Sequence, residues 1–335
     1  MTQAAVASEA TREGARGGTG KVRRQSAGRG TGMVRRRRRR RTIAPYLFSA
    51  PAILLYLGFT VIPVIYALQS SFFAQRLTGG GVLGIKRTVF VGWGNYLGVF
   101  QDASLLSGFG RLAIYGIIAV PLTLGLALLF ALLLDAPGAR IRGFSRTMIF
   151  IPYAVPGVVA ALMWGFMYLP STSPFSYVTR QLGLGSIPFL EPHGLFGAFA
   201  NISICGGVGF NMLIIYTSLQ SIPDELIEAA RLDGANEVQI ALRVKVPLVG
   251  PALVLTSIFG LLGALQLYGE PTMLKPLTNS ISDTWAPLMT IYRDAFTLDN
   301  LPAAAAASMV LAVGTAVVSL AVLAIVRALT RRNNA

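Results

Sequence analysis

Six long apolar stretches constrain the fold of this chain more than any other feature of its sequence. They cover residues 44–72, 112–134, 148–169, 195–219, 252–273 and 303–326. A helix of about 20 residues crosses the hydrocarbon core of a bilayer, which is about 30 Å thick. Backbone polar groups within hydrocarbon must bond inside the segment, so each stretch is expected to be helical. The sequence therefore predicts an all-α, polytopic membrane protein with about six transmembrane helices.

Composition supports a membrane location. The chain is 53% hydrophobic and only 13% charged, whereas an average soluble domain is about 25% charged. The first apolar stretch is too long for a cleaved signal peptide, whose apolar core spans roughly 7–15 residues. Prolines inside the stretches are expected to be tolerated because neighbouring helices satisfy the freed carbonyls; they are Pro51, Pro63, Pro121, Pro152 and Pro156.

The net charge of +15 is concentrated before the first apolar stretch. Residues 1–42 hold thirteen Lys and Arg, including every position from Arg35 to Arg41, against Glu9 and Glu13. This composition predicts a disordered, basic cytoplasmic tail held by anionic lipid headgroups. Nucleic-acid binding is disfavoured because no aromatic platform or DNA-binding motif accompanies the arginines.

Basic residues also predict the orientation of the chain. Arginines and lysines recur in the connections 135–147 and 220–251 and beyond residue 326. By the positive-inside rule these segments are cytoplasmic, as are both termini. The expected organisation is a tail over 1–42, a transmembrane domain over 43–330 with a cytoplasmic loop at 221–247, and a cytoplasmic end at 331–335. The location expected is a bacterial cytoplasmic membrane.

Several classes of function are excluded or disfavoured. Cys205 and His193 are the only residues of their types, which excludes an intrachain disulfide and a Cys/His metal cluster. No phosphate loop or hydrolase motif is present, so the chain is predicted to be neither an enzyme nor the holder of a cofactor. Glu270 is the main ionisable residue within the stretches, which argues against an ion-coupled carrier. That carrier, and a non-transporting scaffold, remain the alternatives to a transporter subunit driven by a partner.

The loop at 221–247 has the pattern of two short helices. Ser221 and Asp224 have N-cap spacing, and Gly234 is a natural stop. Asn236 with Gln239 predicts a second start, and the helix is expected to end at Pro247. Helices of about 8–11 residues are too short to be stable alone. The loop is therefore interpreted as a docking element for a partner protein, with an amphipathic hairpin on the bilayer as the alternative.

The same loop carries a family signature. Glu228-Ala229-Ala230, Asp233-Gly234-Ala235 and then Val244, Val246 and Pro247 resemble the EAA motif of binding-protein-dependent ABC importer permeases, with Val246 where leucine is usual. Residues 90–96 (FVGWGNY), 144–156 (FSRTMIFIPYAVP) and 209–212 (GFNM) also resemble that family. Together they resemble the carbohydrate branch that includes maltose- and glycerol-3-phosphate-type permeases.

This resemblance implies a type I ABC importer permease that forms half of a translocation pathway. The solute that it implies is a sugar or oligosaccharide. The partners implied are a second homologous permease, two ABC ATPase subunits that bind ATP and Mg²⁺, and an extracytoplasmic solute-binding protein. The residues implied to couple to the ATPase are Glu228, Ala229, Ala230, Asp233, Gly234, Ala235 and Pro247.

Candidate solute contacts lie in the fourth and fifth stretches. Asn211 belongs to the fourth, while Gln266, Tyr268 and Glu270 belong to the fifth, where Gln266 and Glu270 are expected one helical turn apart. Polar and aromatic side chains facing a central cavity suit a sugar. The alternative for each is a hydrogen bond between neighbouring helices.

Overall fold

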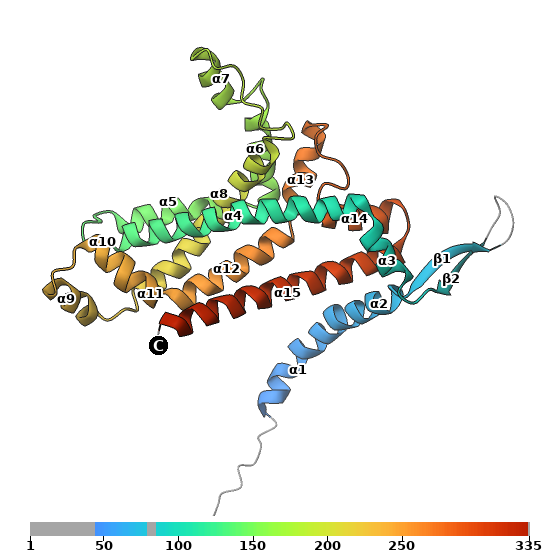
Figure 1. Cartoon of the computed structure of the whole chain (residues 1–335), viewed down its shortest axis with the longest axis horizontal. Helices are drawn as coiled ribbons and strands as arrows, with labels where there is room; N and C mark the ends of the chain where they lie inside the picture. Colours follow the sequence, from blue (N-terminus) through green and yellow to red (C-terminus); the bar gives the residue numbers. More distant parts are fainter. Residues whose placement is uncertain (1–43, 79–84, 334–335) are drawn as a thin grey trace, which may run out of the picture. The chain divides into compact units, whose positions relative to one another are not determined.

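The computed structural model describes residues 44–78 and 85–333, which are mostly helical (Figure 1). The predicted tail at 1–42 lies outside the described residues and stays a prediction. The chain divides after Ile53 into two compact units. The helices that pack against one another belong to the second unit, residues 54–335.

The elements follow one another in this order along the chain: α1 (Ala44–Tyr56), α2 (Ile62–Ser70), β1 (Phe73–Thr78), β2 (Ile85–Phe90), α3 (Gly94–Gln101), α4 (Ala103–Asp135), α5 (Arg142–Ala154), α6 (Gly157–Tyr168), α7 (Pro174–Gln181), α8 (Leu195–Leu219), α9 (Asp224–Leu232), α10 (Glu237–Ile240), α11 (Val246–Leu248), α12 (Gly250–Leu265), α13 (Gly269–Leu274), α14 (Pro287–Tyr292) and α15 (Leu301–Asn333). Within residues 44–78 and 85–333, three π-helical segments occur, at Leu57–Val61 between α1 and α2, at Ala241–Lys245 between α10 and α11, and at Arg293–Thr297 after α14. A 3-10 turn at Lys275–Leu277 follows α13.

The prediction of about six membrane helices is confirmed. By length and composition, five helical segments in the described ranges can cross a membrane: Tyr46–Ser70, Ala103–Asp135, Leu195–Leu219, Gly250–Leu277 and Leu301–Ala324. A sixth span results if the bent pair α5 and α6 counts as one. The second span begins earlier than predicted, because Asp102 caps α4 by accepting hydrogen bonds from the Ser104 and Leu105 backbone amides. A further hydrogen bond from the Ser104 hydroxyl lowers the pKa of Asp102.

The third apolar stretch is not the continuous helix that was predicted. Between α5 and α6 the chain turns by 92° at Val155 and Pro156. A residue before proline is pushed out of the α-region, and Val155 is extended, with φ −76° and ψ 127°. Pro152 lies inside α5. The prolines therefore break the span here, whereas Pro121 lies inside the unbroken helix α4.

The structure is also not purely helical, because β1 and β2 form an antiparallel pair in which Phe73 faces Phe90. The motif at residues 90–96 ties this hairpin to the end of α2. The Asn95 side-chain amide donates to the Ser71 and Phe73 carbonyls, at 2.7 and 2.6 Å. The Tyr96 hydroxyl lies 2.7 Å from the Ser71 hydroxyl. The motif thus holds the chain where it leaves the first span.

Small residues bring α8 close to its neighbours. One face of α4 is buried at four-residue spacing by Ala119, Thr123, Ala127 and Ala131, and α4 packs along α8. On the α5 side, a Cβ added at Gly209 would lie 2.5 Å from the Ile149 carbonyl oxygen. Small residues at such contacts allow helix backbones to approach closely in membranes. The helix α12 then packs against α4, and α15 against α12.

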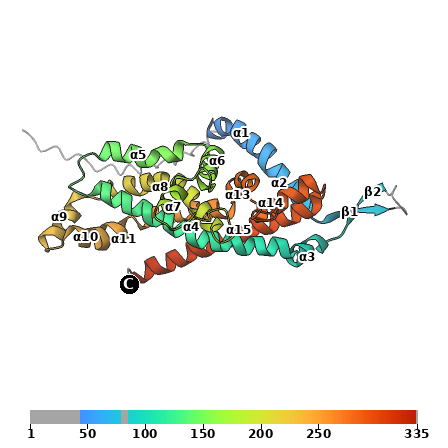
Figure 2. The same ribbon diagram turned by 90° about the horizontal axis from the view of Figure 1, so that it is seen from above.

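Figures 1 and 2 both place α9 and α10 at one end of the α4 helix, and β1, β2 and α3 at its other end. The first end carries Asp135, the last residue of α4, and the other carries Ala103. The loop with the EAA motif and the hairpin with the 90–96 motif therefore lie on opposite ends of the helices.

We predict that Gly209→Ala destabilises the chain because its new methyl group would overlap the α5 backbone. Overpacking of this kind costs about 1–3 kcal/mol. Thermal unfolding of the purified protein in detergent should therefore occur at a lower temperature. Gly197→Ala is the matched control, since it lies on the same helix with nothing within 4 Å of an added Cβ. Equal unfolding temperatures for the two variants would contradict the close contact.

Candidate functional site

The loop between α8 and α12 starts with α9, which has nine residues. None of their side chains is buried within the described part of the chain. Glu228, Ala229 and Ala230 lie on this helix. The spacing predicts that Ser221 caps this helix with Pro223 in its first turn, but the helix begins later, at Asp224, and Ser221 does not cap it. The Ser221 hydroxyl instead donates to the Ser218 carbonyl at 2.7 Å, and Pro223 occupies the N-cap position without a side-chain bond.

The predicted bend lies at Asp233 and Gly234. Gly234 has a φ of +84°, a left-handed backbone conformation that residues with a side chain rarely adopt. Its amide donates to the Arg231 carbonyl, and the Ala235 amide donates to the Ala230 carbonyl, so the last turn of α9 is closed. These bonds satisfy carbonyls that a helix end would otherwise leave unpaired.

The second helix starts with the predicted capping box. The Asn236 side chain accepts from the Gln239 amide, and the Gln239 side chain accepts from the Asn236 amide, each at 2.9 Å. Across the bend, Arg231 pairs with Glu237 at 3.0 Å. That pair is about half exposed and contributes at most about 1 kcal/mol.

Pro247 does not end this helix, contrary to the prediction. The helical path runs from α10 through the π-helical segment Ala241–Lys245 and into α11, which ends at Leu248. Pro247 is the second residue of α11 and directly follows the π-helical segment. The break comes two residues later, at Val249, before α12.

Apolar side chains on the loop face outward. Leu232 is 90% exposed and Val238 66% exposed, and Leu242 is exposed one turn after Val238. Ile240 and Val249 are fully buried and hold the loop to the rest of the chain. Exposed apolar residues on helices too short to stand alone suit a surface that another protein or the bilayer covers.

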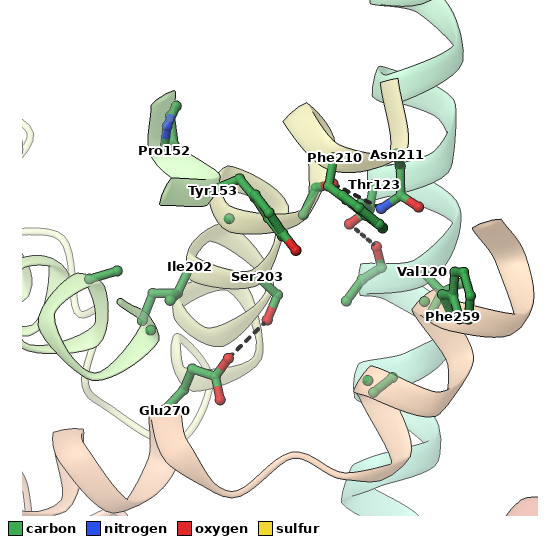
Figure 3. A pocket seen from close by; sticks show the side chains of 18 of the residues that line it. Val120, Thr123, Pro152, Tyr153, Ile202, Ser203, Phe210, Asn211, Phe259 and Glu270 are labelled. Carbon is green, nitrogen blue, oxygen red and sulfur yellow. Dashed lines mark hydrogen bonds between the residues drawn. The ribbon is translucent and has the colours of Figure 1, made fainter. Parts of the chain in front are cut away.

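A second candidate site is a cavity of about 420 Å³ between α4, α5, α6, α8, α12 and the start of α13. A volume of this size suits a small ligand. Figure 3 shows Tyr153 from α5, Ser203 and Phe210 from α8, and Glu270 from α13 turned toward this space. The Tyr153 and Phe210 rings stack, with centroids 4.9 Å apart and planes 16° from parallel.

A hydrogen-bonded chain crosses one wall of the cavity. The Tyr115 hydroxyl lies 2.5 Å from the Ser203 hydroxyl, which donates to Glu270 Oε1 at 3.4 Å. Glu270 is the one charged residue among the described lining residues. The wall therefore offers hydroxyls and one carboxylate to a ligand.

The structure places two of the four predicted solute contacts at this cavity. Asn211 and Glu270 line it. The Asn211 side-chain amide donates to the Gly207 carbonyl at 2.8 Å. Its carbonyl oxygen is buried and has no partner in the described part of the chain. A buried acceptor without a partner is costly and suits a ligand donor.

Gln266 and Tyr268 are not among the described residues that line the cavity. The expectation that Gln266 and Glu270 lie one helical turn apart is wrong, because α12 ends at Leu265 and α13 begins at Gly269. Gln266 is exposed at the turn. Tyr268 packs against Tyr292, with ring centroids 5.8 Å apart.

Sequence reasoning missed several lining residues, among them Tyr115, Thr123, Tyr153, Ser203 and Phe210. The spacing held a signal for two of them, because Ser203 precedes Phe210 by seven residues and Asn211 by eight, which places all three on one side of α8. The others come from helices whose mutual rotation no single stretch of sequence reveals. Within the described ranges, no three His, Cys, Asp or Glu side chains gather as a metal site would need.

A family model described as "Binding-protein-dependent transport system inner membrane component" matches residues 123–334. Curated relatives are similar over most of the chain. The sn-glycerol-3-phosphate transport system permease protein UgpA of Agrobacterium fabrum is 30% identical over 81% of this chain and 90% of its own length. The probable ABC transporter permease protein YurN of Bacillus subtilis is 28% identical over 83% of this chain and 94% of its own.

A solved structure shares the fold. A chain of a bacterial ABC transporter involved in the import of the acidic polysaccharide alginate superposes with a TM-score of 0.73 at 21% identity. The match covers 86% of this chain and 96% of the other. The same transporter type has been solved in complex with an alginate pentasaccharide-bound periplasmic protein.

We predict that Gly234→Val loosens the bend between α9 and α10. A branched side chain at φ +84° costs about 1–3 kcal/mol, so the amides of both short helices should exchange with deuterium faster than in the native chain. Gly234→Asn is the control, since asparagine tolerates this conformation best among residues with side chains. Unchanged exchange in Gly234→Val would show that the bend does not depend on glycine.

Proposed function

The chain belongs to the family of binding-protein-dependent transport system inner membrane components, and from this premise we propose how its loop and its cavity divide the work of transport. The chain is a multi-pass inner-membrane permease of an ATP-driven importer, and ATP hydrolysis is carried out by a separate partner subunit. In the proposal, the loop at 221–247 receives the ATPase, and the cavity is this chain's share of the solute pathway.

The loop fits the coupling role through its exposed apolar surface. Leu232 and Val238 project from two short helices that the bend at Gly234 sets apart. A cleft on the ATPase would cover them, and its closure would move the loop. The residues proposed to couple are Glu228, Ala229, Ala230, Asp233, Gly234, Ala235 and Pro247.

The observation that carries the pathway assignment is the cavity beside two interruptions in membrane helices. The lining residues Pro152, Val155 and Gly157 flank the bend between α5 and α6, and Glu270 follows the break after α12. Irregular backbone at membrane depth is tolerated where protein buries it or where it lines a water-filled cavity. The proposed pathway residues are Asn211 and Glu270, joined by Tyr153, Ser203 and Phe210. Gln266 and Tyr268 would act from outside the cavity wall.

We propose an uncharged sugar or oligosaccharide as the solute. The stacked rings of Tyr153 and Phe210 suit the apolar face of a sugar, and the Ser203 and Tyr115 hydroxyls suit its hydroxyl groups. The relative named above is a glycerol-3-phosphate permease, yet the described lining here holds no Lys, Arg or His. An anionic solute would meet Glu270 without a cation to compensate it, which is costly away from water.

The remaining partners follow from the family. A second homologous permease would complete the pathway, an extracytoplasmic binding protein would deliver the solute, and two ATPase subunits would hold ATP and Mg²⁺. This chain would bind no cofactor. The basic residues at 1–42 would lie at the cytoplasmic headgroups, with both termini in the cytoplasm.

We predict that Leu232→Glu combined with Val238→Glu abolishes co-purification of the ATPase with this chain. The new charges would be buried without a partner in the complex but exposed in the chain alone, so insertion should be normal. Leu184→Glu is the control, because Leu184 is 76% exposed outside the loop. The measurement is affinity purification from native membranes. If no ATPase co-purified with the chain that carries no substitution, the coupling role would be contradicted.

We also predict that a strain lacking this chain loses growth on an uncharged sugar and not on sn-glycerol-3-phosphate or a uronic acid. Restoring the native chain should restore growth. A copy with Tyr153→Ala and Phe210→Ala should fail to restore it despite normal membrane levels, because the stacked platform is gone. Loss of growth on an anionic solute alone would show that the charge argument is wrong.

A further inference from the structure

A single carboxylate joins the loop to both long helices of the cavity wall. The Asp135 side chain, at the end of α4, accepts from Lys245 Nζ on Oδ2 at 2.5 Å. Its other oxygen, Oδ1, accepts from Gln220 Nε2 at 2.6 Å, just after α8. Lys245 is the last residue of the π-helical segment of the loop. Three segments far apart in the sequence therefore meet at Asp135.

The ion pair in this junction is buried. The side chains of Lys245 and Asp135 are 8% and 10% exposed. The other ion pairs found in the described residues are more exposed, including Arg231 with Glu237 and Lys275 with Asp283. Burying a charge pair often contributes no more stability than apolar side chains of similar size would. Stability alone therefore gives little reason for these charges, whereas a directional link gives one.

The surroundings of the pair are partly polar and partly apolar, and the two bonds to Asp135 are what give the link a direction. A polar hollow of about 380 Å³ lies beside the pair, lined by Asp135, Gln220 and Lys245 and by Asp224 and Arg231 of α9. Apolar contact at Val249 also holds the loop, in a cluster with Leu134 and Leu219. Apolar contact is non-directional and allows sliding, whereas two short bonds to one carboxylate define a direction.

The helices that meet at Asp135 also form the cavity. The α4 helix supplies Tyr115 and Thr123 to its wall, and α8 supplies Ser203 and Asn211. A displacement of the loop that is carried through Lys245 would therefore act on both helices at once. The ends that receive it are the ends nearest the loop in Figures 1 and 2.

We propose that Asp135 and Lys245 are positioning residues that transmit movement of the loop to α4 and α8. This inference rests on the proposed coupling role of the loop. It assigns the transmission to one buried ion pair rather than to general packing. Gln220 holds the second oxygen of Asp135 and so brings α8 into the same movement.

The experiment uses the importer purified with its native partners and its binding protein, in nanodiscs. In a Cys205→Ser background, Ala160→Cys places a maleimide target in the cavity wall. The rate of labelling of this chain is measured without nucleotide and with ATP, Mg²⁺ and vanadate, and ATP hydrolysis is measured in parallel. With the native pair, ATP should change the rate by about tenfold, within the usual range of coupling between sites.

Asp135→Leu combined with Lys245→Met removes the charges together, so neither is left buried alone. This variant should assemble and hydrolyse ATP, but ATP should change its labelling by less than about twofold. Exchange of the charges, Asp135→Lys with Lys245→Asp, and the conservative variant Lys245→Arg should retain more of the change. Lys275→Met with Asp283→Leu is the matched control, since that pair is exposed and should leave the change intact.

A full response to ATP in the apolar pair would overturn the proposal. So would equal loss in the apolar pair, the charge exchange and Lys245→Arg, because the ionic link would then not be what matters. The failure of the underlying function looks different. In that case the native pair itself would show no ATP-dependent labelling, or no ATPase would be present in the purified complex.

Discussion

The close approach of α8 to α4 and α5 is the interaction on which the rest of the structure depends. In a membrane the lipid is as apolar as the helix surface, so packing between backbones replaces the hydrophobic effect as the force that joins helices. Gly209 brings the α8 backbone against α5, and Ala127 and Ala131 of α4 are buried in one cluster with Val208 and Met212 of α8. Larger residues at these positions would separate the helices that enclose the cavity and carry the loop at their ends.

The two interruptions in membrane helices serve the same cavity. The bend at Val155 and the gap after Leu265 would each be unfavourable in contact with lipid, where free backbone groups find no water. Placed at the cavity, they bring Tyr153 and Glu270 to its wall from helices that otherwise run past it. Part of the polar lining of the cavity is thus a consequence of where the helices break.

The loop has an exposed outer part and a buried anchor. The α9 helix has no fully buried side chain within the described chain, and the bend after it lies at one glycine with a positive φ. The part of the loop that leads back to α12 is different, because Ile240 and Val249 are fully buried and Lys245 pairs with Asp135. A partner can therefore hold the outer part while the inner part stays joined to α4 and α8.

The sequence by itself determined the membrane helices, the bend at Gly234 and the capping box at Asn236, because hydrophobic length and cap residues act locally. It also determined the family, through the motif from Glu228 to Pro247. Only the tertiary structure decided that Pro156 bends a span while Pro121 does not, and that Glu270 reaches the cavity while Gln266 does not. Only the fold brings Asp135 to Lys245, 110 positions apart. Such contacts depend on how helices rotate and pack against one another, which no local pattern encodes.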